Sequence, residues 1–203
     1  MNFLKLQNLV TILLMNSNSH KILNPSFRNP AVLVFCGSKD LSDFKKNINI
    51  VPKQWPPSNP HGTVHGGFAS KLEMLLRDNE EIYEFIKKNN NIIFAGHSLG
   101  GATSILLAST VPDKVKSVYT FGAPPLSSLE FKRYYKSIGL SSKTFRYTTP
   151  KDPVSNLIPI YNHIGNKILL PYEGSNSRLQ HHDIETYRMM IEKMEMGGWT
   201  LYP

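Results

Sequence analysis

The sequence predicts an α/β fold in which a mainly parallel central sheet is flanked by helices. Short apolar runs typical of buried strands alternate along the chain with segments whose apolar residues recur at helical spacing. This alternation favours βαβ units and therefore parallel strands. The chain has 203 residues, 40% of them hydrophobic, and shows no internal repeat, so we expect one sizeable core.

The elements follow one another in a regular order. An apolar run closed by Gly37 predicts the first buried strand, and a run stopped by Gly122 and Pro124 predicts the third. The predicted strands cover residues 31–35, 92–95, 118–121, 144–148 and 167–170. Helical periodicity predicts helices over residues 67–88, 102–109, 129–138 and 182–196.

Residues 1–25 are expected to form a helical or poorly ordered segment ahead of a single domain over residues 26–203. The apolar positions of this segment that recur at helical spacing are Leu6, Leu9, Val10, Leu13 and Leu14. The stretch is too short to span a bilayer, and no cleavage site typical of a signal peptide follows it. We therefore prefer an amphipathic helix packed on the domain to a weak signal or a membrane-surface segment.

The chain is strongly basic, with a formal net charge of +8. It lacks the basic run with interleaved aromatics that binds nucleic acid, so no nucleic-acid partner is expected. A solvated basic surface is the simplest explanation, and attraction to an anionic lipid surface is the alternative. Cys36 is the only cysteine, so no internal disulfide can form. This favours a cytoplasmic location, with peripheral membrane association and secretion as alternatives.

Ser98 lies in the stretch NIIFAGHSLGGA, which contains the pattern Gly-x-Ser-x-Gly. The pattern alone is weak, but here it lies between a predicted strand and a predicted helix. Such a turn lifts a serine hydroxyl above the edge of a sheet, and Gly96 and Gly100 leave no Cβ in its way. The helix that follows also favours a nearby oxyanion. We therefore interpret Ser98 as a nucleophile, with an ordinary glycine-rich turn as the alternative.

Asp152 is the best placed acid for a catalytic triad, because it follows a predicted strand that comes after Ser98. Asp113 precedes a strand and belongs at the opposite edge of the sheet. Asp183 adjoins the best histidines and would point elsewhere on its helix. A turn-forming role before Pro153 is the alternative explanation of Asp152.

Three histidines follow Asp152: His163, His181 and His182. His163 begins a strand-like run, where a structural role is expected. His181 or His182 could take a proton from Ser98, and residue chemistry alone does not choose between them. Neither His61 with His65 nor His181 with His182 and Asp183 makes a complete set of metal ligands, and no phosphate-loop motif is present. We therefore expect no metal and no cofactor.

An oxyanion hole needs two donors. One would be the backbone amide of Leu99, directly after the nucleophile. The other should come from the loop after the first core strand, where the amide of Ser38 fits, with help from its hydroxyl.

Several stretches, in order, resemble the class 3 lipases, the fungal-lipase-like branch of the α/β-hydrolases. They are VFCGSKDLSDF, VHGGFAS, GHSLGGA, TFGAPP and RYTTPKDPVSNLIP with HIGNKILL. A last stretch, HHDIETY, is similar to the ending of plant-type phospholipase relatives. The resemblance covers residues 31–190 and implies an α/β-hydrolase fold.

Carried over by position, the resemblance implies Ser98 as nucleophile, Asp152 as acid and His182 as base. His182 is chosen because it directly precedes the DIETY stretch. The resemblance also assigns the oxyanion hole to Ser38 and Leu99. The nucleophile elbow would be formed by Gly96, His97 and Gly100.

The segment between Ser38 and His65 occupies the place of the family's lid. Its apolar residues suit a loop that covers a site until it meets a lipid surface; the lid candidates are Leu41, Phe44, Ile48 and Trp55. A fixed loop that packs these side chains down is the alternative.

The expected activity is therefore that of a serine hydrolase cleaving carboxylic esters of lipids, as a triacylglycerol lipase or a phospholipase A1-like enzyme, at a lipid–water interface. A non-catalytic binding module with the lipase fold and a lipid acyltransferase are the alternatives.

Overall fold

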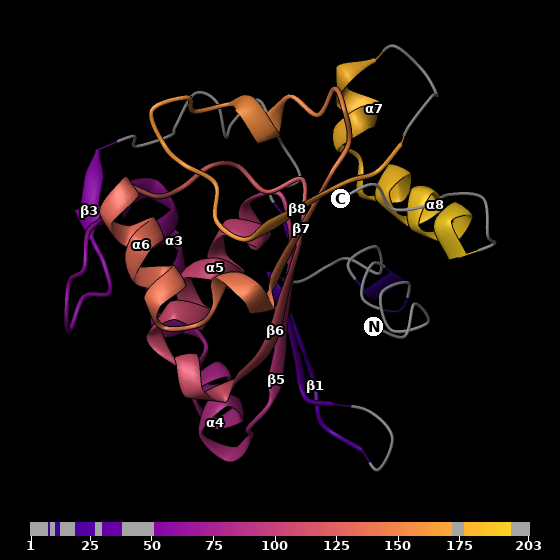
Figure 1. Ribbon diagram of the computed structural model, residues 1–203. Helices are drawn as coiled ribbons and strands as arrows, with labels where there is room; N and C mark the ends of the chain where they lie inside the picture. The colour runs from indigo at the N-terminus through magenta and orange to yellow at the C-terminus, as the bar shows by residue number, and fades with distance from the viewer. Residues whose placement is uncertain are drawn as a thin grey trace.

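The computed structural model describes residues 8, 11–12, 19–26, 30–37, 51–171 and 177–195. Its centre is a six-stranded sheet in the order β1-β2-β5-β6-β7-β8, in which β1 is antiparallel to β2 and the other neighbours are parallel (Figure 1). The strands are β1 (His20–Leu23), β2 (Val32–Phe35), β5 (Ile92–His97), β6 (Val115–Phe121), β7 (Thr144–Thr148) and β8 (Asn166–Leu169). The predicted α/β class and parallel sheet are confirmed.

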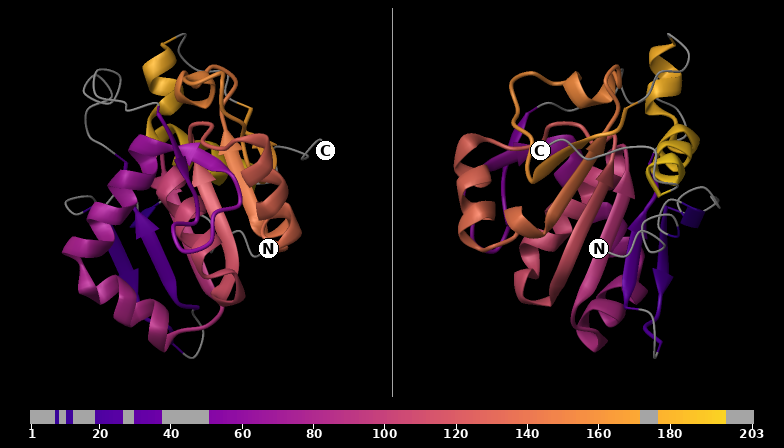
Figure 2. Two further views of the ribbon diagram at one scale, coloured as in Figure 1. Left: turned by 90° about the vertical axis from the view of Figure 1, so that its left-hand side faces the viewer. Right: turned by 45° about the vertical axis from the view of Figure 1, so that its right-hand side comes forward.

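Helices cover both faces of the sheet, so the molecule has three layers (Figures 1 and 2). On one face lie α3 (Gly66–Asp78), α4 (Glu80–Lys88), α5 (Leu99–Thr110) and α6 (Leu129–Ser137). On the other face lies α8 (Ile184–Glu195), which follows the short helix α7 (Arg178–His182). A small hairpin of β3 (Pro52–Gln54) and β4 (Thr63–His65) precedes α3. Single 3-10 turns are η1 (Pro112–Lys114), η2 (Ser141–Lys143) and η3 (Val154–Asn156).

Alternate residues of the central strands supply two hydrophobic cores. In β2, Leu33 and Phe35 join the core under α3 and α5, whereas Val32 and Val34 join the core under α8. Because side chains of a strand point alternately to opposite faces, a strand covered on both sides must be apolar throughout. This explains why β2 and the first four residues of β5 are continuous apolar runs.

The structure corrects three expectations about secondary structure. First, the helix predicted over residues 67–88 is broken at Asn79, whose side chain donates to the Leu75 carbonyl at 2.7 Å and so ends α3. Second, the helix predicted over 182–196 is broken at Asp183, so His182 ends α7 instead of opening a long helix. Third, residues 20–23 form strand β1, although they fall in the segment expected to be helical or poorly ordered.

The parallel strands carry their loops to one edge of the sheet. Phe35 is level with Gly96, and His97 with Phe121, which is in turn level with Tyr147. The segments that follow β2, β5, β6 and β7 therefore begin side by side, as expected for a site at the carboxyl ends of strands. Within the described segments, no helix is both long and apolar enough to cross a membrane.

Candidate active site

Ser98 lies in a strained turn between β5 and α5. Its φ of 55° and ψ of −126° place a non-glycine residue in a region that side chains rarely adopt. The turn is held because the Ser98 amide donates to the Phe121 carbonyl of β6 at 2.9 Å, and the Gly101 amide donates to the Ser98 carbonyl at 3.0 Å. The strain is thus supported by the sheet on one side and the helix on the other.

The glycines around Ser98 are required by close backbone contacts. A Cβ on Gly96 would lie 2.1 Å from the Gly100 carbonyl oxygen, and a Cβ on Gly100 would lie 2.1 Å from the Phe35 carbonyl oxygen. A side chain on Gly96 would therefore push the strand away from the start of α5, and one on Gly100 would push the elbow away from β2. This places the predicted elbow residues Gly96, His97 and Gly100 in one tight turn.

The side chains of Ser98, His182 and Asp152 form one line of hydrogen bonds. His182 Nε2 lies 2.9 Å from Ser98 Oγ, and His182 Nδ1 lies 2.9 Å from both carboxylate oxygens of Asp152. Ser98 directly follows β5, Asp152 lies in the loop after β7, and His182 is the last residue of α7. All three are nearly buried, with exposed fractions of 2–3%.

The neighbouring histidines have other partners. His181 Nδ1 lies 3.3 Å from the Thr149 hydroxyl, and His163 donates through Nε2 to the Ser155 carbonyl at 2.7 Å. A carbonyl only accepts, so His163 fastens the acid loop and takes no part in the line of bonds to Ser98. Burial and the nearby Arg146 lower the pKa of His163 to about 4, which keeps it neutral.

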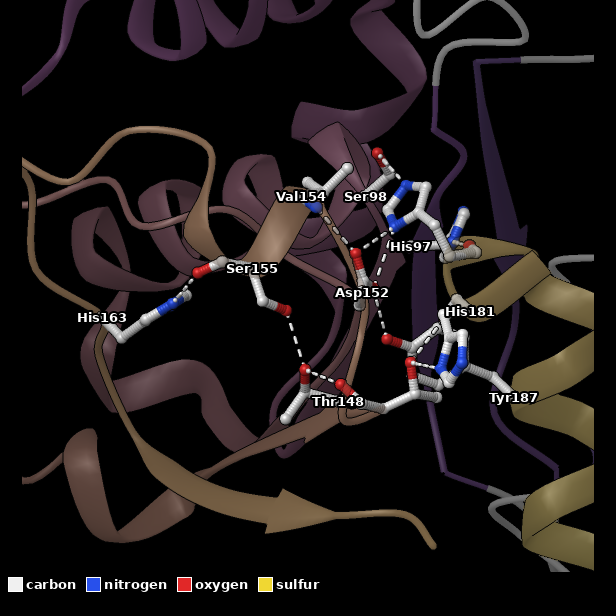
Figure 3. A network of polar contacts seen from close by, with 11 residues as sticks. His97, Ser98, Thr148, Asp152, Val154, Ser155, His163, His181 and Tyr187 are labelled. Atoms are coloured by element: carbon white, nitrogen blue, oxygen red, sulfur yellow. Dashed lines mark hydrogen bonds and ion pairs between the residues drawn. The ribbon is translucent and has the colours of Figure 1, made fainter. Parts of the chain in front are cut away.

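The Asp152 carboxylate has two further donors that the sequence reasoning did not assign. The Val154 amide donates to Oδ1 at 2.8 Å, and the Tyr187 hydroxyl donates to Oδ2 at 2.5 Å (Figure 3). Burial, followed by the charge of Asp152, raises the pKa of Tyr187 well above its usual value, so the hydroxyl keeps its proton. The signal for Tyr187 was its place in the HHDIETY stretch, five residues after His182.

Gly122 was noted only as the residue that stops a strand, yet it lies against the acid and the base. A Cβ at this position would lie 2.6 Å from Asp152 Oδ2 and 2.9 Å from His182 Nδ1. Its φ of 59° also favours glycine. The glycine of the TFGAPP stretch therefore makes the space in which the two side chains meet.

The predicted oxyanion residues are only partly described. Leu99 is the first residue of α5, where backbone amides have no partner within the helix. Ser38 lies outside the described residues, but its neighbour Gly37 approaches the nucleophile closely, because a Cβ on Gly37 would lie 3.0 Å from Ser98 Cβ. The loop after β2 thus begins beside the nucleophile.

Of the lid candidates, Leu41, Phe44 and Ile48 lie outside the described residues. The lid prediction is wrong for Trp55. Its side chain is 1% exposed and lies in the core on the α3 and α5 side of the sheet. Its indole Nε1 donates to the Ser109 hydroxyl of α5 at 2.9 Å. Packing and this hydrogen bond fix Trp55 in the interior, so it is not a side chain that could meet a lipid surface in this structure.

Comparison with known proteins identifies the family of this chain. The profile of the family described as Lipase (class 3) matches residues 32–162, which include Ser98 and Asp152. The chain belongs to the class 3 lipase family. His182 lies beyond the matched range.

No group of three metal-binding side chains is found in the part of this lipase-family chain that the structure describes.

Two relatives of this chain share less than 30% of its residues over the aligned range. The lipase of Rhizomucor miehei is 29% identical over 142 residues, covering 63% of this chain and 37% of that protein. The chloroplastic phospholipase A1-Ialpha2 of Arabidopsis thaliana is 22% identical over 212 residues, covering 79% of this chain and 43% of that protein. The chain therefore spans less than half the length of these two relatives.

Solved structures show the same fold. A propeptide complex of a Rhizomucor miehei lipase deletion mutant has a TM-score of 0.60 at 21% identity, covering 85% of this chain and 59% of that chain. A triacylglycerol lipase whose catalytic centre is a serine protease triad has a TM-score of 0.57 at 22% identity, covering 74% of this chain and 65% of that chain. These likenesses identify the α/β-hydrolase architecture of the class 3 lipases in this chain.

Proposed function

We propose that this protein is a serine hydrolase that cleaves carboxylic ester bonds of lipids through an acyl-enzyme. The observation that carries the proposal is the unbroken line of hydrogen bonds from Ser98 through His182 to Asp152, with both His182 contacts at 2.9 Å. Membership of the class 3 lipase family and the triad of the structurally similar triacylglycerol lipase support the same chemistry.

The hydrogen-bond partners assign the protons. An ionised carboxylate only accepts, so the Nδ1 of His182 carries the hydrogen that faces Asp152. The Nε2 of the neutral ring is then the acceptor for the hydroxyl proton of Ser98. His182 therefore acts as a general base when Ser98 Oγ attacks an ester carbonyl, and Asp152 stabilises the imidazolium that forms.

The tetrahedral intermediate places a negative charge on the former carbonyl oxygen. The amide of Leu99, at the start of α5, and the amide of Ser38, after β2, would donate to this oxygen. His182 then gives its proton to the leaving alcohol, and the acyl group remains on Ser98. Attack by water, with His182 again as base, releases the fatty acid.

Glycerolipids are the proposed substrate class, because the relatives named above are lipases and a phospholipase A1. The net charge of +8 favours association with an anionic phospholipid surface over a neutral one. The protein would then act by peripheral contact with a lipid–water interface.

A fluorophosphonate probe tests the reaction directly, because it reacts only with an activated serine. We expect labelling of the protein, no labelling of Ser98→Ala, and full labelling of a surface control, Ser137→Ala. Absence of labelling that depends on Ser98 would leave a non-catalytic lipase-fold module as the better description.

The substrate is tested on a panel of triacylglycerol, monoacylglycerol and anionic or neutral phospholipids. We expect release of fatty acid that depends on Ser98. Ester products formed in preference to free acid when an alcohol is added would identify an acyltransferase instead.

A further inference from the structure

The last two backbone carbonyls of helix α7 each accept a hydrogen bond from a side chain at the carboxyl ends of the parallel strands. The Thr149 hydroxyl, after β7, donates to the His181 carbonyl at 2.6 Å. The imidazole of His97, the last residue of β5, bonds the His182 carbonyl through Nε2 at 2.7 Å (Figure 3). The carbonyls at a helix end lack partners within the helix, so these two contacts satisfy them from outside.

The His182 carbonyl fixes the protonation of His97. Because a carbonyl only accepts, His97 Nε2 must carry a hydrogen. Burial, and to a smaller extent the nearby His182, lower the pKa of His97 to about 3. His97 is therefore neutral in the physiological range and donates without adding a positive charge. This matters because the centre of its ring lies only 4.7 Å from that of His182, which becomes cationic during the proposed reaction.

The helix that carries His182 depends on such outside contacts. α7 has five residues, which is too short for a helix to be stable by itself. The position of the base is therefore set by what its backbone and side chain touch. Asp152 holds the ring, and His97 holds the backbone of the same residue.

From this we infer that His97 is a positioning residue for the base, a role that rests on the proposed function. His97 precedes Ser98 in the chain, so one turn of backbone carries both the nucleophile and the donor that holds the base. The hydrogen bond to the His182 carbonyl thus ties the nucleophile elbow to α7. It keeps His182 Nε2 within reach of Ser98 Oγ.

Two amide substitutions separate the donor from the bulk of the side chain. The amide nitrogen of His97→Gln occupies nearly the place of the imidazole Nε2 and can still donate. The side chain of His97→Asn is one methylene shorter and cannot reach the His182 carbonyl. We expect kcat of His97→Gln within about tenfold of the parent, because a comparable hydrogen bond is kept. We expect kcat of His97→Asn to fall about 10²-fold with KM nearly unchanged, a loss that a misplacement of about 1 Å can cause.

A second readout does not depend on turnover. The proton shared by His182 Nδ1 and Asp152 should give a downfield proton NMR signal, assigned by its loss in His182→Gln. We expect this signal in the parent and in His97→Gln, and its broadening or loss in His97→Asn. The surface histidine variant His61→Gln is the matched control and should leave both the signal and kcat unchanged.

The outcomes separate this inference from the proposed function. Equal kcat and equal signals in the Gln and Asn variants, whether both high or both low, would overturn the positioning role. If the parent does not react with the fluorophosphonate but the signal still differs between the two variants, the proposed hydrolase function fails while the positioning of His182 by His97 stands.

Discussion

At the scale of single residues, the carboxylate of Asp152 is the most heavily bonded group of the site. It accepts from the Val154 amide, from His182 Nδ1 and from the Tyr187 hydroxyl. Three donors around a buried carboxylate offset the loss of its hydration and fix its orientation. The direction of the His182 ring follows from that orientation.

Replacing Tyr187 with Phe removes one donor and keeps the packing of the ring. Without the hydroxyl, the carboxylate holds more charge against His182, so the protonated form of the base is favoured. We expect the low-pH limb of the kcat/KM profile to move to higher pH. The free energy of unfolding should fall by about 2 kcal/mol, as for other bonds to a charged group. A pH profile that keeps its position, with only a lower plateau, would show that Tyr187 acts through packing alone.

The two adjacent histidines provide an internal comparison. Only His182 contacts Ser98, whereas His181 faces Thr149. We expect His182→Gln to reduce kcat by about 10⁴- to 10⁶-fold, as loss of a triad member does. His181→Gln should reduce it by less than about tenfold, the value of one neutral hydrogen bond. Similar losses from both substitutions, measured on a soluble ester, would contradict the assignment of the base.

At the scale of elements, the junction of β4 and α3 buries a histidine that has no polar partner in the described part of the chain. His65 is fully buried, and neither ring nitrogen has a hydrogen-bond partner among the described residues. Its ring stacks on Phe68, with the ring centres 4.0 Å apart. Burial lowers the pKa of His65 from 6.5 to about 4, so the ring is neutral near pH 7. His65 thus packs as an aromatic core side chain.

This burial predicts a loss of stability in acid. The folded pKa of His65 lies below its ordinary value, so between pH 6.5 and 4 the unfolded chain binds more protons. The contribution of the neutral His65 ring to the free energy of unfolding is complete above pH 6.5. It is lost as the pH falls from 6.5 to 4. The free energy of unfolding of the parent should drop between pH 7.5 and pH 5. In His65→Phe, which keeps the stacking, we expect this drop to be smaller by about 2 kcal/mol.

Urea unfolding at the two pH values measures this difference. His61→Phe is the control, because His61 is exposed and stacks on Tyr134 at the surface. The same pH dependence in the parent and in His65→Phe would mean that His65 does not remain neutral in the fold.

At the scale of the whole molecule, the sheet extends one strand beyond the part of the chain that we expected to form the domain. β1 pairs antiparallel with β2, from His20 opposite Phe35 to Leu23 opposite Val32. The Cys36 amide also donates to the Ser19 carbonyl at 3.0 Å. β1 therefore covers the edge of the strand whose end leads to Gly37 and the predicted oxyanion loop.

Two truncations isolate the contribution of β1. A chain of residues 19–203 keeps the strand, and a chain of residues 26–203 removes it. We expect the shorter chain to unfold at lower urea concentration and to aggregate more readily, because the edge of β2 is then unpaired. Its ester hydrolysis should fall as well, since β2 positions the loop beside Ser98. Equal stability of the two chains would show that β1 does not stabilise the domain, which would then begin at residue 26 as expected from the sequence.

Most of the fold was predictable because its signals are local. The predicted strands over residues 31–35 and 92–95 are buried on both faces, so their apolar runs are unbroken and end at turn residues. The breaks at Asn79 and Asp183 were missed because helical periodicity continues across both. β1 was missed because four partly apolar residues, HKIL, become a strand only through pairing with β2.

The α/β class, the elbow around Ser98 and the acid in the loop after β7 could be predicted from the sequence, because the order of elements and the residue types beside a strand are read directly along the chain. Residue chemistry left His181 and His182 equivalent, and the family resemblance chose His182. Only the tertiary structure decided which of the two reaches Ser98, that Tyr187 bonds Asp152, and that His97 holds the backbone of His182. These contacts join segments 35–85 residues apart, and no local pattern in the chain records the distance between side chains that folding brings together.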